Sequence, residues 1–351
     1  MSASAASGSD IVRGSVETFG KTAAGEDVGR IRIAAGDLTA HILTYGAVVQ
    51  DLRLEGHDHP LVLGFETFEP YIEDSVYFGA IVGRYANRIA HGRFTIDGER
   101  FQATPGAHGV HTLHGGPEGI DRRLWTIVLC GADFVTLALR DRDGEMGFPG
   151  NLDIQCTYRV TAHATLAIEL SATCDAPTLC NLAHHGWFNL EDGGAGSVLD
   201  HRLSIDADAY LPVDATLIPT GVVQPVEGTD FDFRTPRTIR SADGRPQTAY
   251  DHNFCLAAAR RPLTRAAWVQ GPRSGVEMEV WSTEPGLQFF WGGIPARSSP
   301  GLDGITYQPN AAICLEPQIW PDSPNHRYFP QAILRPGDRY EQRTEYRFRQ
   351  G

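Results

Sequence analysis

Lysine is almost absent from this 351-residue sequence. Lys21 is the only lysine, so nearly all of the 30 basic residues are arginines. These face 43 acidic residues, which gives a formal net charge of −13, and no basic cluster stands out. A nucleic-acid-binding protein usually carries a basic face. We therefore expect no nucleic-acid partner, and the acidic balance is compatible with a neutral substrate.

Long hydrophobic runs are also missing. No stretch approaches the roughly 18 apolar residues that a membrane-spanning helix needs, and residues 1–10 have neither the basic nor the apolar region of a signal peptide. The six cysteines are scattered and form no C-x-x-C pair, which is typical of a reducing compartment. We expect a cytoplasmic protein without membrane contact, whose residues 1–10 form a disordered tail.

No long amphipathic helix can be placed, whereas runs of alternating hydrophobicity recur throughout. They lie at 152–160, 166–170 and 276–280. Alternation with a period of two is typical of half-buried strands. Asp97-Gly98 separates two short apolar runs, and this dipeptide suits a tight hairpin because both turn residues need positive φ. The pattern predicts an all-β protein, a large antiparallel β-sandwich, with residues 11–351 as a single domain.

The polar residues that could carry chemistry gather in blocks rich in His, Asn and Gly. The blocks are Asn87-Arg88-Ile89, Leu113-His114-Gly115-Gly116, Asn181–Leu190, Tyr250–Phe254 and Cys314–Gln318. Opening a sugar hemiacetal requires a base for the C1 hydroxyl and an acid for the ring oxygen, and a carboxylate and an imidazolium suit these roles. Arg, Asn, Asp and Gln could orient the other hydroxyls, and Trp187 could stack on the apolar face of a pyranose.

Simpler interpretations exist for each residue taken alone. Arg88 could be a structural ion-pair residue, His114 a loop residue and Trp187 part of the core. The spacing of His108, His111 and His114 could suggest a metal, but residues i and i+3 lie on opposite faces of a strand, and no carboxylate pattern accompanies them. We expect no metal. The adjacent His184 and His185 point to opposite faces of a strand, so at most one faces a substrate.

Taken in order, the blocks resemble the aldose 1-epimerase family over nearly the whole chain beyond the tail. The shared blocks are Gly64-Phe-Glu, Gly83–Ile89, Leu113–Gly116, Asp143–Gly150, Asn181–Leu190, Ile218–Gly221, Gly228–Arg234, Tyr250–Phe254, Glu284–Gln288, Cys314–Gln318, Pro321–Asn325 and Leu334–Gly337. One such block would be a weak match, whereas the ordered set is specific.

The resemblance implies a galactose-mutarotase-type β supersandwich with an open cleft and no cofactor, acting on a small monosaccharide. It implies that Glu316 is the general base on the C1 hydroxyl, that His185 is the general acid at the ring oxygen, and that His114 assists. The implied binding residues are Asn87, Arg88, Asp251, Gln288 and Trp187. We also expect a monomer or weak homodimer, and an imidazolium form of His185 that nearby carboxylates favour.

The sequence departs from the usual family pattern beside the acid. His184 stands where Asn is usual and Trp187 where Tyr is usual, which leaves the preferred hexose or pentose open. Competing functions are a glycoside hydrolase with Glu316 and Asp251 as its carboxylate pair, a non-catalytic sugar-binding module, and an enzyme for phosphorylated sugars. An enzyme for phosphorylated sugars would need extra cationic residues around the cleft, and the sequence contains no dedicated phosphate loop.

Overall fold

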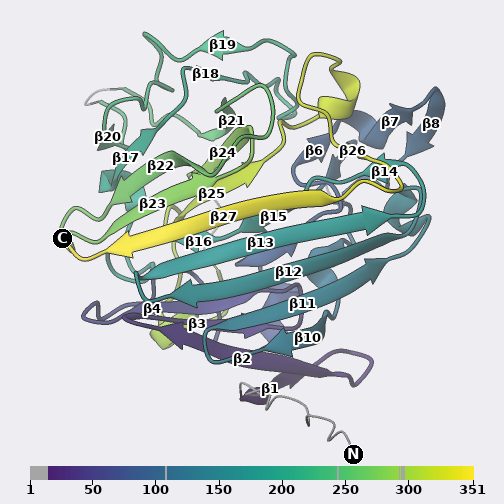
Figure 1. Cartoon of the computed structure of the whole chain (residues 1–351). Helices are drawn as coiled ribbons and strands as arrows, with labels where there is room; N and C mark the ends of the chain where they lie inside the picture. Colours follow the sequence, from purple (N-terminus) through teal and green to yellow (C-terminus); the bar gives the residue numbers. More distant parts are fainter. Residues whose placement is uncertain (1–14, 107–108, 243–244, 292, 294–296) are drawn as a thin grey trace, which may run out of the picture.

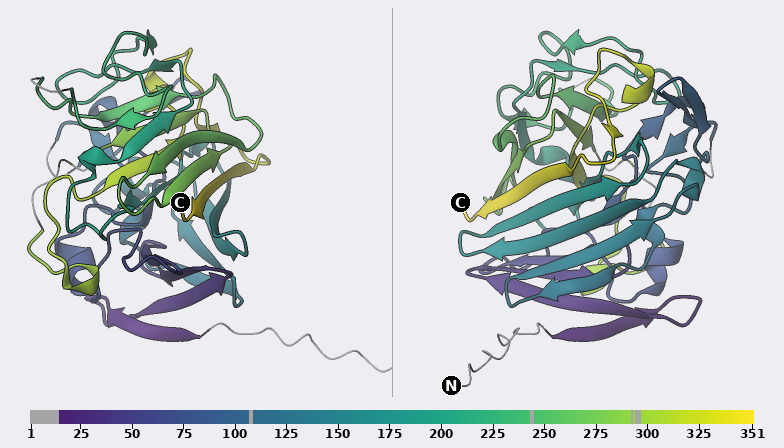
Figure 2. Two further views of the ribbon diagram at one scale, coloured as in Figure 1. Left: turned by 90° about the vertical axis from the view of Figure 1, so that its left-hand side faces the viewer. Right: turned by 45° about the vertical axis from the view of Figure 1, so that its right-hand side comes forward.

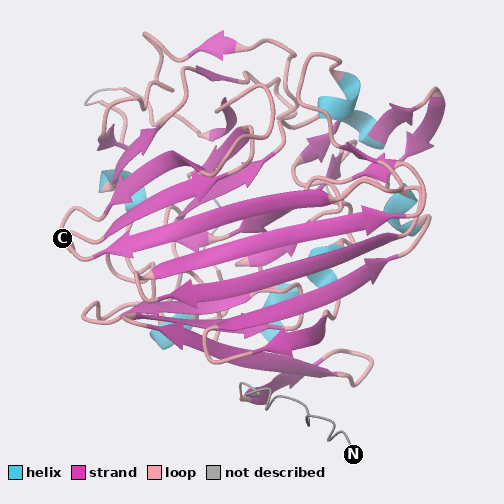
Figure 3. Cartoon of the chain, viewed as in Figure 1, coloured by secondary structure: helices cyan, strands magenta, loops and turns pink. Residues whose placement is uncertain are grey.

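Three antiparallel sheets dominate the structure, a computed structural model that describes residues 15–106, 109–242, 245–291, 293 and 297–351. Figure 3 shows how little helix accompanies the strands. The predicted all-β class is therefore confirmed, whereas the predicted disordered tail lies outside the described residues. Among the residues described, no helix has the length and apolar character needed to cross a membrane.

The largest sheet has nine strands in the order β10-β11-β12-β13-β27-β23-β22-β17-β20, and its long strands cross the front of the molecule in Figure 1. Its strands are β10 Thr126–Cys130, β11 Phe134–Asp141, β12 Leu152–Thr161, β13 Thr165–Cys174, β17 Arg202–Ile205, β20 Arg237–Thr238, β22 Thr264–Gln270, β23 Glu277–Ser282 and β27 Tyr340–Arg349. The alternating runs predicted at 152–160, 166–170 and 276–280 form β12, β13 and most of β23. In β12 every second residue is buried, as the pattern predicts.

Two smaller sheets pack with the first (Figure 2). The four-stranded sheet has the order β1-β2-β3-β4, with β1 Val16–Lys21, β2 Asp27–Ala35, β3 Leu38–Leu43 and β4 Val49–Leu54. The six-stranded sheet has the order β16-β25-β24-β21-β18-β19. Its strands are β16 Trp187–Phe188, β18 Ala209–Tyr210, β19 Gln224–Pro225, β21 Asp251–Cys255, β24 Gly286–Phe290 and β25 Ile313–Gln318.

Short strand pairs and turns connect the sheets. The pairs are β15 Ala183–His185 with β5 Ala80–Val82, β6 Arg88–Ile89 with β9 Thr112–Leu113, β7 Arg93–Ile96 with β8 Glu99–Gln102, and β14 Thr178–Leu179 with β26 Ile333–Leu334. The helices are α1 Glu69–Glu73 and the 3₁₀ turns η1 Ala90–Gly92, η2 Ile120–Arg122, η3 Glu145–Gly147, η4 Val198–Asp200, η5 Leu302–Gly304 and η6 Ser323–Asn325. Asp97 and Gly98 join β7 to β8 with φ of 51° and 87°, so the predicted hairpin is confirmed.

One large hydrophobic cluster draws side chains from all three sheets. Strand β25 shows how the core positions polar groups. Ile313 and Leu315 point into this cluster. The side chains at alternate positions, those of Cys314, Glu316 and Gln318, therefore occupy the other face of the strand. All six residues of β25 are nevertheless buried. A carboxyl group is thus held on a rigid central strand away from bulk water.

Candidate active site

Strand register brings the predicted base and acid together. Gln288 on β24 is the direct cross-strand partner of Glu316 on β25. On the other side of β25, Trp187 pairs with Cys314, and continuing that antiparallel register by two residues sets His185 opposite Glu316. Directly opposed residues share one face of a sheet. The three side chains therefore form a row across the sheet.

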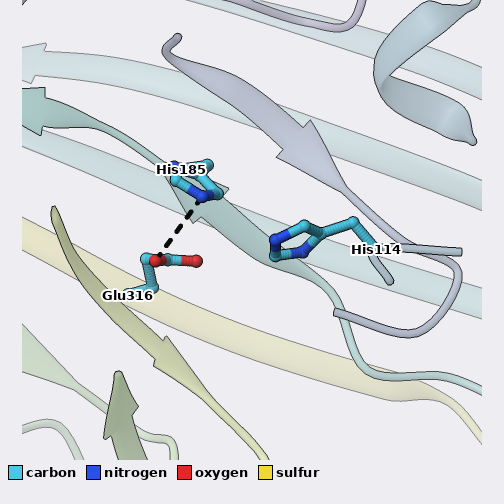
Figure 4. Close-up of side chains that lie close together, drawn as sticks. All are labelled: His114, His185 and Glu316. Atoms are coloured by element: carbon cyan, nitrogen blue, oxygen red, sulfur yellow. Dashed lines mark ion pairs between the residues drawn. The ribbon is translucent and has the colours of Figure 1, made fainter. Parts of the chain in front are cut away.

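Figure 4 shows His185 and Glu316 facing each other, with His114 beside them. The His185 Nε2 atom lies 3.6 Å from Oε1 of Glu316, and the His114 and His185 ring centroids are 5.2 Å apart. All three side chains are buried, with exposed fractions of 5%, 6% and 2% for His114, His185 and Glu316. The Nδ1 atom of His185 and Oε2 of Glu316 have no hydrogen-bond partner among the described residues. Polar atoms of this kind are available to a ligand.

The backbone of Asn87 fixes the orientation of His114. The Asn87 N–H donates to Nδ1 of His114 at 3.1 Å, and the His114 N–H donates to the Asn87 carbonyl at 3.0 Å. Both residues adopt positive φ, 64° and 51°. Because Nδ1 accepts a hydrogen bond, the neutral ring carries its proton on Nε2. Burial and the neighbouring His185 lower the pKa of His114 well below its ordinary value, so His114 is a neutral N–H donor.

This tautomer argues against a metal, although the three groups have the composition of a metal site. One ligand atom from each of His114, His185 and Glu316 lies within 4.8 Å of the others. A metal on Nε2 of His114 would require the proton on Nδ1, where it would meet the Asn87 N–H. Metal-bound histidines instead donate this second N–H to an acceptor. The arrangement therefore favours hydrogen bonding over metal ligation. The alternative ligand His108 lies outside the described residues.

A second polar group borders the row. Gln288 Nε2 donates to Asp251 Oδ1 at 2.5 Å, and Arg88 Nη2 lies 3.6 Å from Asp251 Oδ2. Asn87 Oδ1 accepts from the Arg88 N–H at 2.9 Å, and its amide nitrogen has no hydrogen-bond partner among the described residues. The structure thus brings together Asn87, Arg88, Asp251 and Gln288, all of which were predicted to bind substrate.

Burial opposes charge on both the predicted base and the predicted acid. It raises the pKa of Glu316 well above its ordinary value, with a further increase from the charge of Asp251 and a decrease from Arg88. Burial also lowers the pKa of His185 to about 4. The expectation that nearby carboxylates favour a cationic His185 is wrong in direction, because desolvation by burial is the largest influence on its pKa. Burial thus favours a protonated carboxyl group and a neutral imidazole in this pair.

Two predictions concerned the residues beside His185. His184 contacts Tyr346 in the core, with Nδ1 3.4 Å from its hydroxyl, so the two adjacent histidines do face opposite sides. The sugar-binding role of Trp187 stays a prediction. Its side chain is only 2% exposed, its Nε1–H donates to the Val76 carbonyl, and its ring stacks beside His185. Trp187 therefore supports His185 from within the core.

Sequence reasoning missed two residues near the site. Tyr77 contacts the rings of both His114 and His185, at centroid distances of 4.6 and 5.5 Å. Asp121 lines the same cavity as Tyr77 and Arg88, which has a volume of about 700 Å³. Neither residue belongs to a recognisable motif. Tyr77 precedes Phe78-Gly79, and its φ of 60° is unusual for tyrosine, so no local signal marks its position.

Comparison with known proteins agrees with this geometry. The family model "Aldose 1-epimerase" matches residues 29–347. The galactose mutarotase of Mus musculus is 39% identical over 92% of this chain and 95% of its own length. The aldose 1-epimerase of Escherichia coli K12 is 40% identical over 88% and 91%. The crystal structure of an aldose epimerase homologue from C. elegans superposes with a TM-score of 0.85, at 32% identity over 92% of this chain and 99% of the other.

These matches extend well beyond the site blocks and cover most of the described sheets. They identify an isomerase that acts on carbohydrates and interconverts the α and β anomers of aldoses. The chain belongs to the aldose 1-epimerase family.

Proposed function

We propose that Glu316, His185 and His114 carry out the anomer interconversion in this chain, on a free hexose of the galactose or glucose type or on a pentose. The observation that carries this proposal is the buried contact of 3.6 Å between His185 Nε2 and Glu316 Oε1. Carboxyl and imidazole groups so close can exchange protons with the two oxygens bonded to C1 of one sugar, the hydroxyl oxygen and the ring oxygen. The relatives named galactose mutarotase and aldose 1-epimerase support the same chemistry.

The proposed reaction moves two protons and breaks one bond. The Glu316 carboxylate takes the proton of the C1 hydroxyl while the His185 imidazolium donates its proton to the ring oxygen. The bond between C1 and the ring oxygen breaks, which leaves an open-chain aldehyde. Rotation about the C1–C2 bond presents the other aldehyde face. Ring closure then returns both protons and yields the other anomer.

Burial favours the product of this proton transfer. Before ring opening both groups are charged, and afterwards Glu316 is a neutral acid and His185 a neutral imidazole. The desolvation that raises the pKa of Glu316 and lowers that of His185 thus stabilises the open-chain state. His114 contributes its Nε2–H without a competing charge, because the Asn87 N–H occupies Nδ1. We assign it to hydrogen bonding at the ring oxygen or C1 side of the sugar.

The remaining polar groups bind the sugar hydroxyls. Asp251 accepts hydrogen bonds, while Gln288 and Arg88 hold its carboxylate in place. Asn87 offers its amide nitrogen. All of these residues come from one chain, which supports a monomer or weak homodimer as the active form. Five of the six cysteines, Cys156, Cys174, Cys180, Cys255 and Cys314, are free thiols, which supports a cytoplasmic location. The main core cluster spans all three sheets, which supports one domain over residues 11–351.

Polarimetry of fresh α-galactose, α-glucose, xylose and arabinose tests the proposal. We expect Glu316→Gln and His185→Asn each to lower kcat by roughly 10²–10⁴-fold, as loss of a general base or acid does. Glu345→Gln is the matched control, because Glu345 is a buried glutamate on β27 that pairs with Arg343 and Arg347. Full activity of Glu316→Gln would remove Glu316 as the base. Release of phenol from an aryl glycoside would instead favour the hydrolase alternative.

A further inference from the structure

Two aromatic rings stack on the imidazole of His185. The Tyr77 ring lies 5.5 Å from it at an interplanar angle of 25°, and the Trp187 ring lies 5.8 Å from it at 17°. Both rings therefore present their faces, not their edges, to the imidazole. The face of an aromatic ring is negative and attracts a cation whose centre lies within about 6 Å. We call Tyr77 and Trp187 the aromatic pair.

The proposed acid needs such support because the other groups around it do little to stabilise the imidazolium form of His185. Glu316 faces Nε2 from β25 and stabilises the imidazolium only as a carboxylate, the form that burial disfavours. His114 meets the His185 ring edge-on and is neutral. On the same strand, burial lowers the pKa of His184 to about 3, so this ring is neutral as well. Burial raises the pKa of the Tyr77 phenol to about 12, so it carries no charge either.

The aromatic pair is itself held firmly. The Trp187 Nε1–H donates to the carbonyl of Val76, the residue before Tyr77, at 3.0 Å. The Tyr77 carbonyl accepts from the Ala80 N–H at 3.1 Å, which closes a tight turn with φ of 60° at Tyr77. A left-handed conformation costs a non-glycine residue of this kind free energy and persists only where surrounding contacts enforce it. The strained backbone conformation at Tyr77 thus places its ring against His185.

We propose that Tyr77 and Trp187 are positioning residues that hold the His185 ring and favour its imidazolium form through their ring faces. This inference rests on the proposed role of His185 as the acid. It gives Trp187 a role that its burial allows, in place of stacking on the sugar. It also explains why an aromatic residue two positions after the acid is useful at all, since residues i and i+2 of a strand point to the same side.

Titration of His185 by NMR of histidine-labelled enzyme tests the inference without a substrate. The His185→Asn variant assigns the resonance. We expect Tyr77→Leu and Trp187→Leu each to reduce the cationic fraction of His185 at a given pH by roughly fivefold to thirtyfold, the range for a desolvated cation–π contact. Tyr77→Phe keeps a ring face and should titrate like the wild type. Trp187→Phe should give a smaller reduction than Trp187→Leu, and it keeps the core filled if the leucine variant does not fold.

Phe94→Leu is the control, since Phe94 is a buried ring that stacks on Phe101 and Phe148 and lies outside the His185 contacts. It should leave the titration unchanged. In parallel, the pH dependence of kcat should move with the NMR midpoint while KM stays nearly constant. Leucine variants that titrate like the wild type would overturn the inference, as would Tyr77→Phe behaving like Tyr77→Leu. An active His185→Asn would instead refute the acid assignment, and the NMR result would still decide the role of the aromatic pair.

Discussion

Asp121 should make the enzyme less stable as the pH rises, and replacing it with asparagine should remove this loss. Asp121 lies in the turn η2 and is 8% exposed. Its Oδ1 atom is buried without a hydrogen-bond partner among the described residues. Burial raises its pKa from 3.8 to about 7, against a smaller opposing effect of Arg122. The folded state therefore keeps a proton that the unfolded chain releases between these two values.

The sign and size of the effect follow from proton linkage. Where the folded state binds more protons, the free energy of unfolding falls as pH increases, by about 1.4 kcal/mol for each pH unit. The contribution is fully present below the unfolded pKa and is lost as pH rises through the folded value near 7. Between pH 5 and pH 8 the wild type should lose about 2–3 kcal/mol from this group alone. Asp121→Asn keeps the shape of the side chain and cannot titrate.

Urea unfolding at pH 5 and pH 8, followed by tryptophan fluorescence, measures this difference. Asp121→Asn should raise the free energy of unfolding over that of the wild type by about 2–3 kcal/mol more at pH 8 than at pH 5. Asp97→Asn is the matched control, because the exposed Asp97 pairs with Arg335 and that pairing lowers its pKa. Its effect should be the same at both pH values. An equal effect of Asp121→Asn at pH 5 and pH 8 would refute the argument that Asp121 is buried and protonated.

Two further predictions concern the acid–base pair and the scaffold. The mutarotation rate should have a broad plateau, fall below about pH 4 as His185 and Glu316 both become protonated, and fall again at high pH as the pair loses its single proton. A polarimetric profile with a midpoint near 6.5, the value of a free imidazole, would contradict this. Arg84→Met should lower the free energy of unfolding by about 3–5 kcal/mol, because it removes the buried partner 2.6 Å from the Asp141 carboxylate and leaves it with the more exposed Arg123, 3.5 Å away. Urea unfolding of this variant should show that loss, and a change below about 1 kcal/mol would show that the ion pair does not stabilise the fold.

The sequence predicts what depends on local periodicity and turn chemistry. The alternation at 152–160 predicted β12, because a half-buried strand selects an apolar residue at every second position. Asp97-Gly98 predicted the β7–β8 hairpin, because positive φ favours these residue types. The opposite orientation of His184 and His185 followed from the same rule. These features need no knowledge of what lies across the fold.

The features missed by sequence reasoning depend on contacts between distant segments. Nothing near Tyr77 indicates that its ring lies against His114 and His185, since that contact is made only when β5 pairs with β15. The burial of Trp187 and the pKa values of His185 and Glu316 are set in the same way, by the whole shell of neighbours. A motif can therefore name the proposed acid and base, but it cannot give their charge.

The two histidines of the site show how the fold makes unlike groups from one residue type. Both rings are buried and they touch each other, so both cannot be cationic together. A backbone N–H that donates to Nδ1 keeps His114 neutral, with its proton on Nε2. Among the residues described, Nδ1 of His185 has no such donor, whereas Nε2 faces a carboxyl group and two ring faces stack on the imidazole. The groups that meet each ring therefore favour His185 as the carrier of the single positive charge in the proposed reaction. In that proposal the second histidine binds the sugar without competing for the proton.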